Sequence, residues 1–206
     1  MTFTGDYNAH FRAQLNRLKT ENRYRHFVEL ERVVGRHPVA LRHNDGGTQE
    51  VTVWCSNDYL GMGHHPEVIA AMRAAAADSG TGAGGTRNIS GTSHALVALE
   101  EELAALHNKD CALTFTSGYV ANEASLSALV AQLPGTLILS DAMNHASIIS
   151  GIKLARTEKV IFRHNDVAHL EQLLAEQPKD RPKIIVFESV YSMDGDTSPI
   201  AEIAAL

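Results

Sequence analysis

Three short polar clusters in the chain each follow a strongly apolar segment. They read TSGYVAN from residue 116, SDAMNHASII from residue 140 and ESVYSMDGD from residue 188. In an open α/β sheet, ligands bind at the carboxyl ends of the parallel strands, where the residues directly after the strands meet. The three clusters are therefore the first place to look for chemistry.

The first cluster is typical of an anion site. Ser117, Gly118 and Tyr119 would form the first turn of a helix. Free backbone N–H groups and the helix dipole favour a phosphate there, and Gly118 would let the ligand come close. The same letters also fit a plain serine cap at a helix start, so position alone leaves both interpretations open.

The second and third clusters offer a ring and a hydroxyl. His145 would lie where a helix begins, so its imidazole could stack on a planar aromatic ligand or titrate. The alternative is a structural histidine that follows a capping Asn144. Ser192 precedes a tight turn at Asp194-Gly195, and the alternative there is a hydrated loop.

A glycine-rich segment at 79–92, SGTGAGGTRNISGT, matches the G-x-G-x-x-G pattern of dinucleotide-binding loops at Gly80, Gly82 and Gly85. That pattern requires a strand directly before it and a helix opening at its end. Here a helix is predicted before the loop, and the segment TRNISGT separates Gly85 from the next helix. This context argues against an NAD-dependent dehydrogenase, which would need a strand directly before Gly80. The polar side chains that suit a carboxylate or amide ligand are Thr86, Arg87 and Asn88.

From residue 66 onward, helical spacing of apolar residues alternates with short, wholly apolar runs. Such runs are typical of parallel strands that are covered on both faces. We expect helices at 66–80, 93–108, 118–133, 145–156, 166–177 and 198–206, and strands at 111–116, 136–140, 159–162 and 183–189. The order predicts an α/β fold, a mostly parallel sheet with helices on both faces.

The N-terminal part has a different pattern. Helical pieces lead to a turn signal in the segment 43–50 and an alternating strand at 51–54. We expect residues 1–55 to form a small N-terminal segment, and residues 56–206 to form the first part of a larger domain. Because the chain stops inside a predicted helix, we expect it to be the N-terminal part of a longer protein.

Composition excludes several function classes. The 206 residues carry a net charge of -6 with scattered Lys and Arg, which argues against nucleic-acid binding. There is no apolar run of about 18 residues that would span a membrane, and no apolar signal core, so we expect a cytoplasmic protein. Cys55 and Cys111 cannot make a disulfide framework. Eleven histidines include no H-x-x-x-H pair, so we expect no metal site.

Six segments, in order, resemble the α-oxoamine synthases, a branch of the fold-type I enzymes that use pyridoxal 5'-phosphate (PLP). They read VWCSNDYLGM, GAGGTRNISGT, LHNKDCALTFTSGYVAN, SDAMNHASII, TEKVIFRHND and FESVYSMDGD. The six together are far more specific than any one of them. The resemblance implies an incomplete fold-type I large domain with PLP as cofactor. It also implies a homodimer with active sites at the subunit interface.

Within this family, GGTRNISGT and TEKVIFRHND resemble most the branch that joins glycine to succinyl-CoA. That reaction releases CoA and CO2 and gives 5-aminolevulinate, the first precursor of haem. The alternatives within the family are 8-amino-7-oxononanoate synthase and glycine C-acetyltransferase. Thr86 favours the first branch, since relatives tend to carry Ser there, and its hydroxyl adds a hydrogen bond for the succinyl group. A non-catalytic binding module remains an alternative of another class.

The resemblance also implies roles for single residues. In the cofactor site these are the backbone of Ser117, Gly118 and Tyr119 at the phosphate, His145 stacked on the ring, and Ser192 at the phenolic oxygen. In the substrate site they are Arg25 at a carboxylate, Asn57 at the glycine-derived part, Thr86 and Asn88 at the succinyl carboxylate, and Ser140 and Lys159 lining the substrate and CoA site.

Two departures from the family pattern bear on these roles. None of the chain's lysines falls in the family's Schiff-base motif, which would lie beyond Leu206, so we expect this chain alone to be inactive. Many relatives carry a histidine at the position of Leu96, whereas this chain has His94 nearby.

Overall fold

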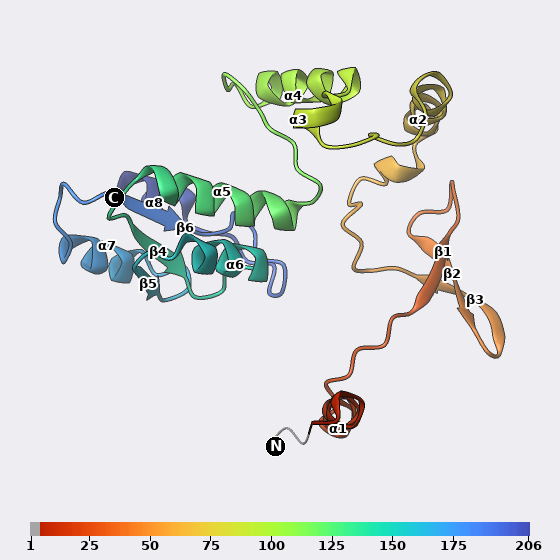
Figure 1. Ribbon diagram of the computed structural model, residues 1–206, viewed down its shortest axis with the longest axis horizontal. Helices are drawn as coiled ribbons and strands as arrows, with labels where there is room; N and C mark the ends of the chain where they lie inside the picture. The colour runs from red at the N-terminus through yellow and green to blue at the C-terminus, as the bar shows by residue number, and fades with distance from the viewer. Residues whose placement is uncertain (1–4) are drawn as a thin grey trace. The chain divides into compact units, whose positions relative to one another are not determined.

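The computed structural model of this protein describes residues 5–206. It divides the chain into two compact units, with the boundary after Gly84. Each unit has its own sheet (Figure 1). In the described part of the chain, no helix combines the length and the apolar character needed to cross a lipid bilayer.

The first unit is built on an antiparallel sheet of three strands in the order β1-β2-β3. Its elements are α1 (Tyr7–Thr20), β1 (Glu29–Arg32), β2 (Val39–Asn44), β3 (Gly47–Thr52), the 3-10 helix η1 (Met62–His64) and α2 (Pro66–Ser79). The predicted turn is the tip of the β2–β3 hairpin, where Asn44 pairs with Gly47 and Gly47 has a φ of 110°. Only glycine adopts that angle without strain, which explains why the turn could be read from the sequence.

The second unit contains a parallel sheet in the order β5-β4-β6. Its elements are α3 (Arg87–Ser90), α4 (His94–Leu106), α5 (Gly118–Gln132), β4 (Leu137–Asp141), α6 (Ala146–Ala155), β5 (Lys159–Phe162), α7 (Val167–Ala175), β6 (Lys183–Val186) and α8 (Ile200–Ala205). Side-chain oxygens cap the long helices: Ser93, Ser117 and Asp166 each accept a backbone N–H in the first turn.

The central strand β4 is buried on both faces, and its side chains alternate between two apolar layers. One layer joins Leu137 and Leu139 to α7, α8 and β5, through Leu170, Ile203 and Phe162. The other joins Ile138 to α5 and α6, through Val130, Ile148 and Ile152. Helices therefore cover both faces of a parallel sheet, and the predicted α/β fold is confirmed (Figure 1).

Two predicted strands differ from the structure. Residues 111–116 form neither helix nor strand, because Thr114 gives its backbone N–H and its hydroxyl to Glu100 rather than to a neighbouring strand. The strand predicted at 183–189 ends at Val186, whose carbonyl accepts the side-chain N–H of Asn144. An apolar run becomes a strand only where a partner strand meets its backbone groups.

The glycine loop has the context that the sequence indicated. Helix α2 ends at Ser79, and Gly80 follows it with a φ of 78°. No strand precedes the glycines, so the dinucleotide-binding interpretation, and with it the NAD-dependent dehydrogenase, is excluded.

Helices α5 and α6 pack side by side, and Gly151 lies at their contact (Figure 1). A Cβ on Gly151 would lie 2.9 Å from the Asn122 carbonyl oxygen and 3.1 Å from the Glu123 Cα. These are backbone atoms, which cannot turn away as a flexible side chain can. The close packing of the two helices therefore depends on a residue without a side chain.

We predict that Gly151→Ala lowers the free energy of unfolding by about 1–3 kcal/mol, the usual cost of overpacking a core. Gly118→Ala is the matched control on α5, because a Cβ there would meet no atom within 4 Å. Urea denaturation followed by circular dichroism measures both variants. Equal stability of the two variants would contradict the assigned helix contact.

Candidate active site

A pocket of about 300 Å³ lies at the carboxyl end of the parallel sheet. The segment that follows β4 and the segment that follows β6 form its walls. The lining residues are Met143, Asn144, His145, Ala146, Glu188, Tyr191, Ser192, Met193 and Asp194. Two residues that the sequence predicted from separate clusters, His145 and Ser192, thus meet in one pocket, as the topology of a parallel sheet requires.

His145 is held at the N-terminus of α6. Its backbone N–H donates to Glu188, and its ring Nδ1 accepts the backbone N–H of Ser147 at 3.1 Å. With Nδ1 used as an acceptor, the proton of a neutral ring sits on Nε2. The Tyr119 ring stands nearly perpendicular to the imidazole, with 6.4 Å between the ring centroids. These contacts fix the ring and leave it in the wall of the pocket.

Tyr119 brings the N-terminus of α5 close to His145. The Ser117 hydroxyl accepts the backbone N–H of Val120 at 3.2 Å, so the serine does cap the helix. The first N–H groups of a helix have no partner inside it, and a Cβ on Gly118 would meet no atom within 4 Å. The capping and anion-binding interpretations are therefore compatible here, because the cap uses one N–H and leaves open space beside the others.

Ser192 lies in a turn that backbone hydrogen bonds define. Tyr191 donates its N–H to the Asp196 carbonyl, and Gly195 donates its N–H to the Tyr191 carbonyl, both at 2.9 Å. Gly195 has a φ of 75°, which favours glycine at this place. The predicted turn at Asp194-Gly195 thus positions the serine hydroxyl.

This turn is fastened to the sheet through a buried carboxylate. Asp141 ends β4 and is 2% exposed. Its oxygens accept the backbone N–H groups of Met143 at 2.8 Å and Asn165 at 3.0 Å, and lie 2.8 Å from His164 Nδ1. On its other side, His164 Nε2 is 2.6 Å from the Asp196 carboxylate. One histidine thus joins the end of β4 to the turn that carries Ser192.

The pKa values in this network follow from its hydrogen bonds. Burial alone would raise the pKa of Asp141, but the N–H groups of Asn165 and Met143, together with His164, lower it. The hydrogen bonds that the His164 ring donates, first to Asp141 and then to Asp196, raise the pKa of His164. We infer an imidazolium between two carboxylates, with the Tyr191 ring edge-on at 4.4 Å between centroids.

The side chain of Asn144 is fixed by its amide nitrogen, which leaves its amide oxygen without a hydrogen-bond donor among the described residues. Its Nδ2 donates to Ser140 Oγ at 2.9 Å and to the Val186 carbonyl at 2.8 Å. Its Oδ1 is buried and accepts no hydrogen bond within the described residues. Asn144 lines the pocket, whereas Ser140, predicted as a substrate residue, is buried and orients Asn144.

The other predicted residues of this unit lie outside the pocket lining. Ser117, Gly118 and Tyr119 adjoin it, through the contact between the Tyr119 and His145 rings. Lys159 begins β5 and so lies at the opposite end of the strand from the pocket. Thr86 precedes α3 as its N-cap, and Asn88 is within that short helix. The neighbouring Arg87 forms two bonds of 2.7 and 2.8 Å with Glu100. The positive charge of Arg87 is therefore paired with Glu100 within the fold.

Glu100 is the anchor of the segment that contains Thr86 and Asn88. It accepts from Arg87 and from both the N–H and the hydroxyl of Thr114. These contacts, the Arg87 bond first, lower the pKa of Glu100 to about 2. The same carboxylate thus holds the loop before α4 and the extended segment before α5.

The two predicted residues of the first unit have different surroundings. Arg25 is exposed in the segment between α1 and β1. Asn57 lines a pocket of about 550 Å³ within that unit, together with residues of its sheet.

Sequence reasoning missed His164 and Asp196 as residues that position the site. The signal was present: His164 is the second residue after β5, and the rule that examines residues after strands applies to it as well. The two partners lie 32 residues apart in the chain, so nothing in the local pattern pairs them.

Comparison with known proteins places the chain among related enzymes. Residues 49–206 match the family model described as aminotransferase class I and II. The chain is 54% identical over 98% of its length to a 5-aminolevulinate synthase of Bradyrhizobium diazoefficiens, and 56% identical over 98% to one of Rhizobium meliloti. It spans 49% and 50% of those proteins, about half the length of the curated relatives it matches.

Solved structures give a consistent result. A serine palmitoyltransferase of S. paucimobilis with PLP and myriocin bound matches 97% of this chain and 51% of its own, with a TM-score of 0.83 and 33% identity. An 8-amino-7-oxononanoate synthase from Francisella tularensis matches 73% of this chain and 40% of its own, with a TM-score of 0.59 and 27% identity. The fold is therefore that of the fold-type I PLP enzymes.

The His164 network predicts a specific dependence of stability on pH. Because the folded-state pKa of His164 is raised, its stabilisation is complete below about pH 6.5, the usual histidine pKa. It is lost as pH rises through the raised value. The folded-state pKa of Asp141 is lowered. The stabilisation that Asp141 contributes is therefore complete above about pH 3.9 and is lost as pH falls through the folded-state pKa.

We therefore expect the unfolding free energy to fall between pH 6 and pH 9, and to fall less in His164→Gln. Urea denaturation across this range measures it. His107→Gln, an exposed histidine at the end of α4, is the control and should keep the wild-type slope. A His164→Gln slope equal to that of the wild type would refute the inferred ion cluster.

Proposed function

This chain belongs to the aminotransferase class I and II family, and on that premise we propose that the complete gene product joins glycine to succinyl-CoA with PLP as cofactor. The products are 5-aminolevulinate, CoA and CO2. The observation that carries the proposal is the pocket that unites His145 with Ser192, close to Tyr119 at the N-terminus of α5. The relatives named 5-aminolevulinate synthase, at 54% and 56% identity, support this choice of reaction.

The pocket residues, together with the N-terminus of α5 beside them, fit a flat, phosphorylated pyridine. The fixed His145 ring offers a stacking face, and the open N-terminus of α5 at Ser117 and Gly118 offers N–H groups to a phosphate. Asn144 Oδ1 is a buried acceptor without a partner in the described chain. A ligand that donates a hydrogen bond would satisfy it.

PLP supplies, when bound, an electron sink for a carbanion at the glycine carbon. The residues of this chain bind and orient the cofactor in this part of the site. His145 would stack on the ring, the Ser192 hydroxyl would donate to the phenolic oxygen, and the backbone of Ser117, Gly118 and Tyr119 would hold the phosphate. A backbone N–H holds the His145 ring, and backbone hydrogen bonds hold the turn that carries Ser192, so both residues are positioned without the ligand.

For the substrates, we propose that Thr86 and Asn88 bind the succinyl carboxylate, that Arg25 binds a substrate carboxylate and that Asn57 contacts the glycine-derived part. The Arg87–Glu100 pair supports this, because it fixes the loop that carries Thr86 and Asn88. We assign Ser140 an indirect role, since it orients Asn144. We do not assign Lys159 to this pocket, because it lies at the other end of β5.

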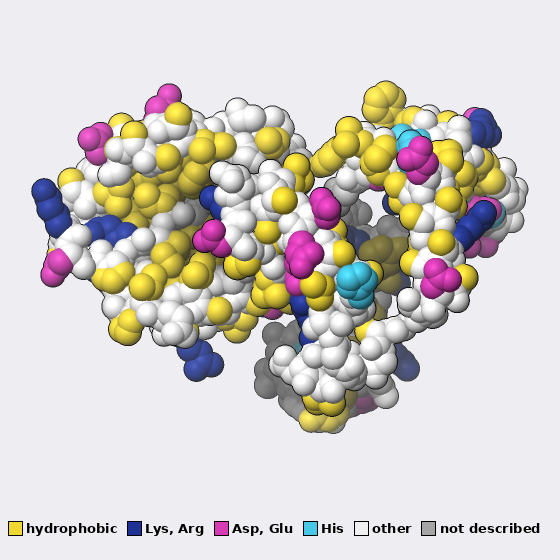
Figure 2. Space-filling view, turned by 90° about the horizontal axis from the view of Figure 1, so that it is seen from above, with side chains coloured by type: hydrophobic (Ala, Val, Ile, Leu, Met, Phe, Trp, Pro, Cys, Tyr) yellow, Lys and Arg dark blue, Asp and Glu magenta, His cyan; other side chains and the backbone are white. Residues whose placement is uncertain are grey.

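A homodimer is also part of the proposal. Many large apolar side chains are exposed in the described chain, and Figure 2 shows several such areas on one face. Of the exposed apolar side chains in the described chain, Phe27 is 97%, Trp54 92% and Met193 87% exposed. Apolar surface of this extent is typical of faces that another part of an assembly covers.

The test of the function is turnover by the complete gene product loaded with PLP. We expect 5-aminolevulinate from glycine and succinyl-CoA, detected by its colour reaction, and the absorption band of bound PLP. Turnover of acetyl-CoA or a pimeloyl donor, without turnover of succinyl-CoA, would instead support glycine C-acetyltransferase or 8-amino-7-oxononanoate synthase.

A second prediction concerns the acyl group. Thr86→Val keeps the shape of the side chain but removes its hydroxyl. We expect kcat/KM for succinyl-CoA to fall about 10- to 100-fold, the worth of one hydrogen bond to a charged group. Butyryl-CoA, which lacks the carboxylate, should be turned over equally by both enzymes. Thr86→Ser keeps the hydroxyl and serves as the control. An equal fall in kcat/KM with succinyl-CoA and butyryl-CoA would show that Thr86 does not bind the carboxylate.

A further inference from the structure

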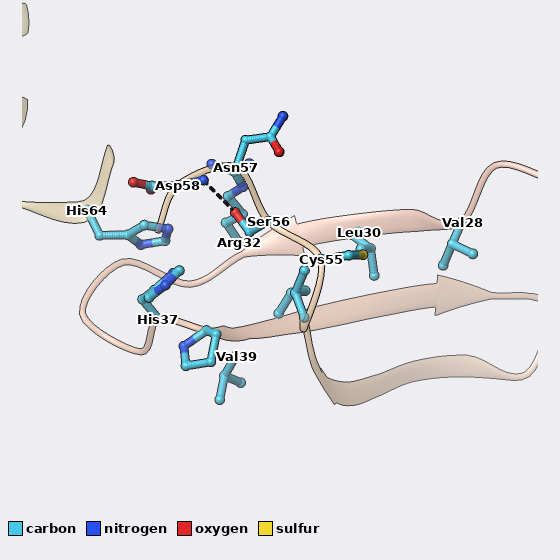
Figure 3. A pocket seen from close by; sticks show the side chains of 13 residues that line it. Val28, Leu30, Arg32, His37, Val39, Cys55, Ser56, Asn57, Asp58 and His64 are labelled. Atoms are coloured by element: carbon cyan, nitrogen blue, oxygen red, sulfur yellow. Dashed lines mark hydrogen bonds between the residues drawn. The ribbon is translucent and has the colours of Figure 1, made fainter. Parts of the chain in front are cut away.

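Three side chains from separate segments of the first unit converge beside its sheet. His37 lies in the loop between β1 and β2, Asp58 follows β3, and His64 ends η1. Each offers one ligand atom, and these atoms lie within 4.8 Å of one another. Figure 3 shows the rings of His37 and His64 next to each other and tilted, with Asp58 close to them. The centroids of the two rings are 5.5 Å apart.

Independent features prepare this cluster for a ligand. His64 Nδ1 is buried and makes no hydrogen bond to any described residue. The Asp58 carboxylate is oriented by the backbone N–H of Gly63, at 3.2 and 3.4 Å from its two oxygens. All three residues line or adjoin a pocket of about 550 Å³, which leaves room for an ion and its water. An unpartnered imidazole nitrogen beside an oriented carboxylate is costly unless something binds there.

We propose that His37, Asp58 and His64 form a binding site for one divalent transition-metal ion, with Zn²⁺ as the best fit. Two imidazoles and one carboxylate are a common zinc donor set, and a water would complete a tetrahedral sphere. Alkaline-earth ions are disfavoured, because Ca²⁺ and Mg²⁺ select oxygen ligands.

The geometry requires only a small movement of side chains. Ligand atoms around a tetrahedral zinc ion are roughly 3.3 Å apart, given bonds of about 2.0–2.1 Å. His37 is the exposed member of the cluster, so a rotation of its side chain can bring it toward the other two ligands. The Gly63 N–H remains bonded to Asp58 as the contact that orients the ligand, as is usual for metal-bound carboxylates.

Arg32 is the charge that opposes an ion here. It lines the same pocket, and a Cβ on Gly63 would lie 4.0 Å from its Nη1 and 2.8 Å from Asp58 Oδ2. The guanidinium and the carboxylate therefore border the same space, and the arginine weakens cation binding. This makes a second, opposite test possible, because removal of the arginine charge should tighten binding.

The site would fasten two parts of the first unit together. An ion held by Asp58 and His64 on one side and by His37 on the other joins the segment after β3 to the loop before β2. Asn57, next to Asp58, would be held with it. A ligand that binds only the folded form stabilises that form in proportion to its occupancy.

The experiment is a Zn²⁺ titration of the chain by calorimetry, without an affinity tag and after removal of metal with a chelator. We expect one site per chain and a rise in Tm on addition of Zn²⁺. Co²⁺ should give the visible spectrum of tetrahedral nitrogen and oxygen coordination. His64→Gln and His37→Gln should each weaken binding at least tenfold, since even loss of a supporting contact costs about that much. Arg32→Met should tighten it.

His65→Gln is the matched control, because His65 neighbours His64 but does not belong to the cluster. It should bind Zn²⁺ like the wild type. Circular dichroism of the metal-free variants separates loss of a ligand from loss of fold, and the exposed His37 is the variant expected to keep its fold. Equal Zn²⁺ affinity in the wild type, His37→Gln and His65→Gln, or no binding by the wild type, would overturn the proposal.

Discussion

The buried carboxylate of Asp141 is the constraint on which the candidate site depends. It ends the central strand, where water cannot solvate it, so it must find donors within the fold. Two backbone N–H groups and His164 supply them. Because His164 also binds Asp196, satisfying one buried charge fixes the turn that carries Ser192. The same strand end leads directly to Asn144 and His145. Asp141 therefore fixes the positions of both walls of the pocket.

The rest of the second unit brings that strand end into position. β4 is apolar on both faces, so it is central in the sheet and needs a helical layer on each side. Gly151 lets α5 and α6 pack closely, and the α5 N-terminus thereby reaches the neighbourhood of His145 through Tyr119. The apolar residues of β4 and the glycine at position 151 thus determine both the packing of the core and the arrangement of the pocket.

The sequence was informative wherever the determining contacts are local. Wholly apolar runs at β4, β5 and β6 and capping residues such as Ser117 gave the elements, and the rule about strand ends gave His145 and Ser192 as partners in one pocket. It failed where a distant partner decides the outcome. The run at 111–116 lacks a neighbouring strand and binds Glu100 instead, and His164 meets Asp196 only after folding.

The same limit applies to the first unit. Histidine spacing along a helix gave no reason to expect a metal ion, because that rule examines one helix face. His37, Asp58 and His64 come from three segments and meet through the sheet and the turn that follows it. Clusters of this kind become visible only when the chain is folded.

The most direct measurement of the central claim is the protonation state of the His164 ring, read by nitrogen-15 NMR of the chain at neutral pH. The account predicts that both ring nitrogens carry a proton and that the pKa of the ring is raised above the ordinary histidine value. A neutral ring at pH 7, with a proton on one nitrogen only, would contradict the ion cluster that joins Asp141 to the turn of Ser192.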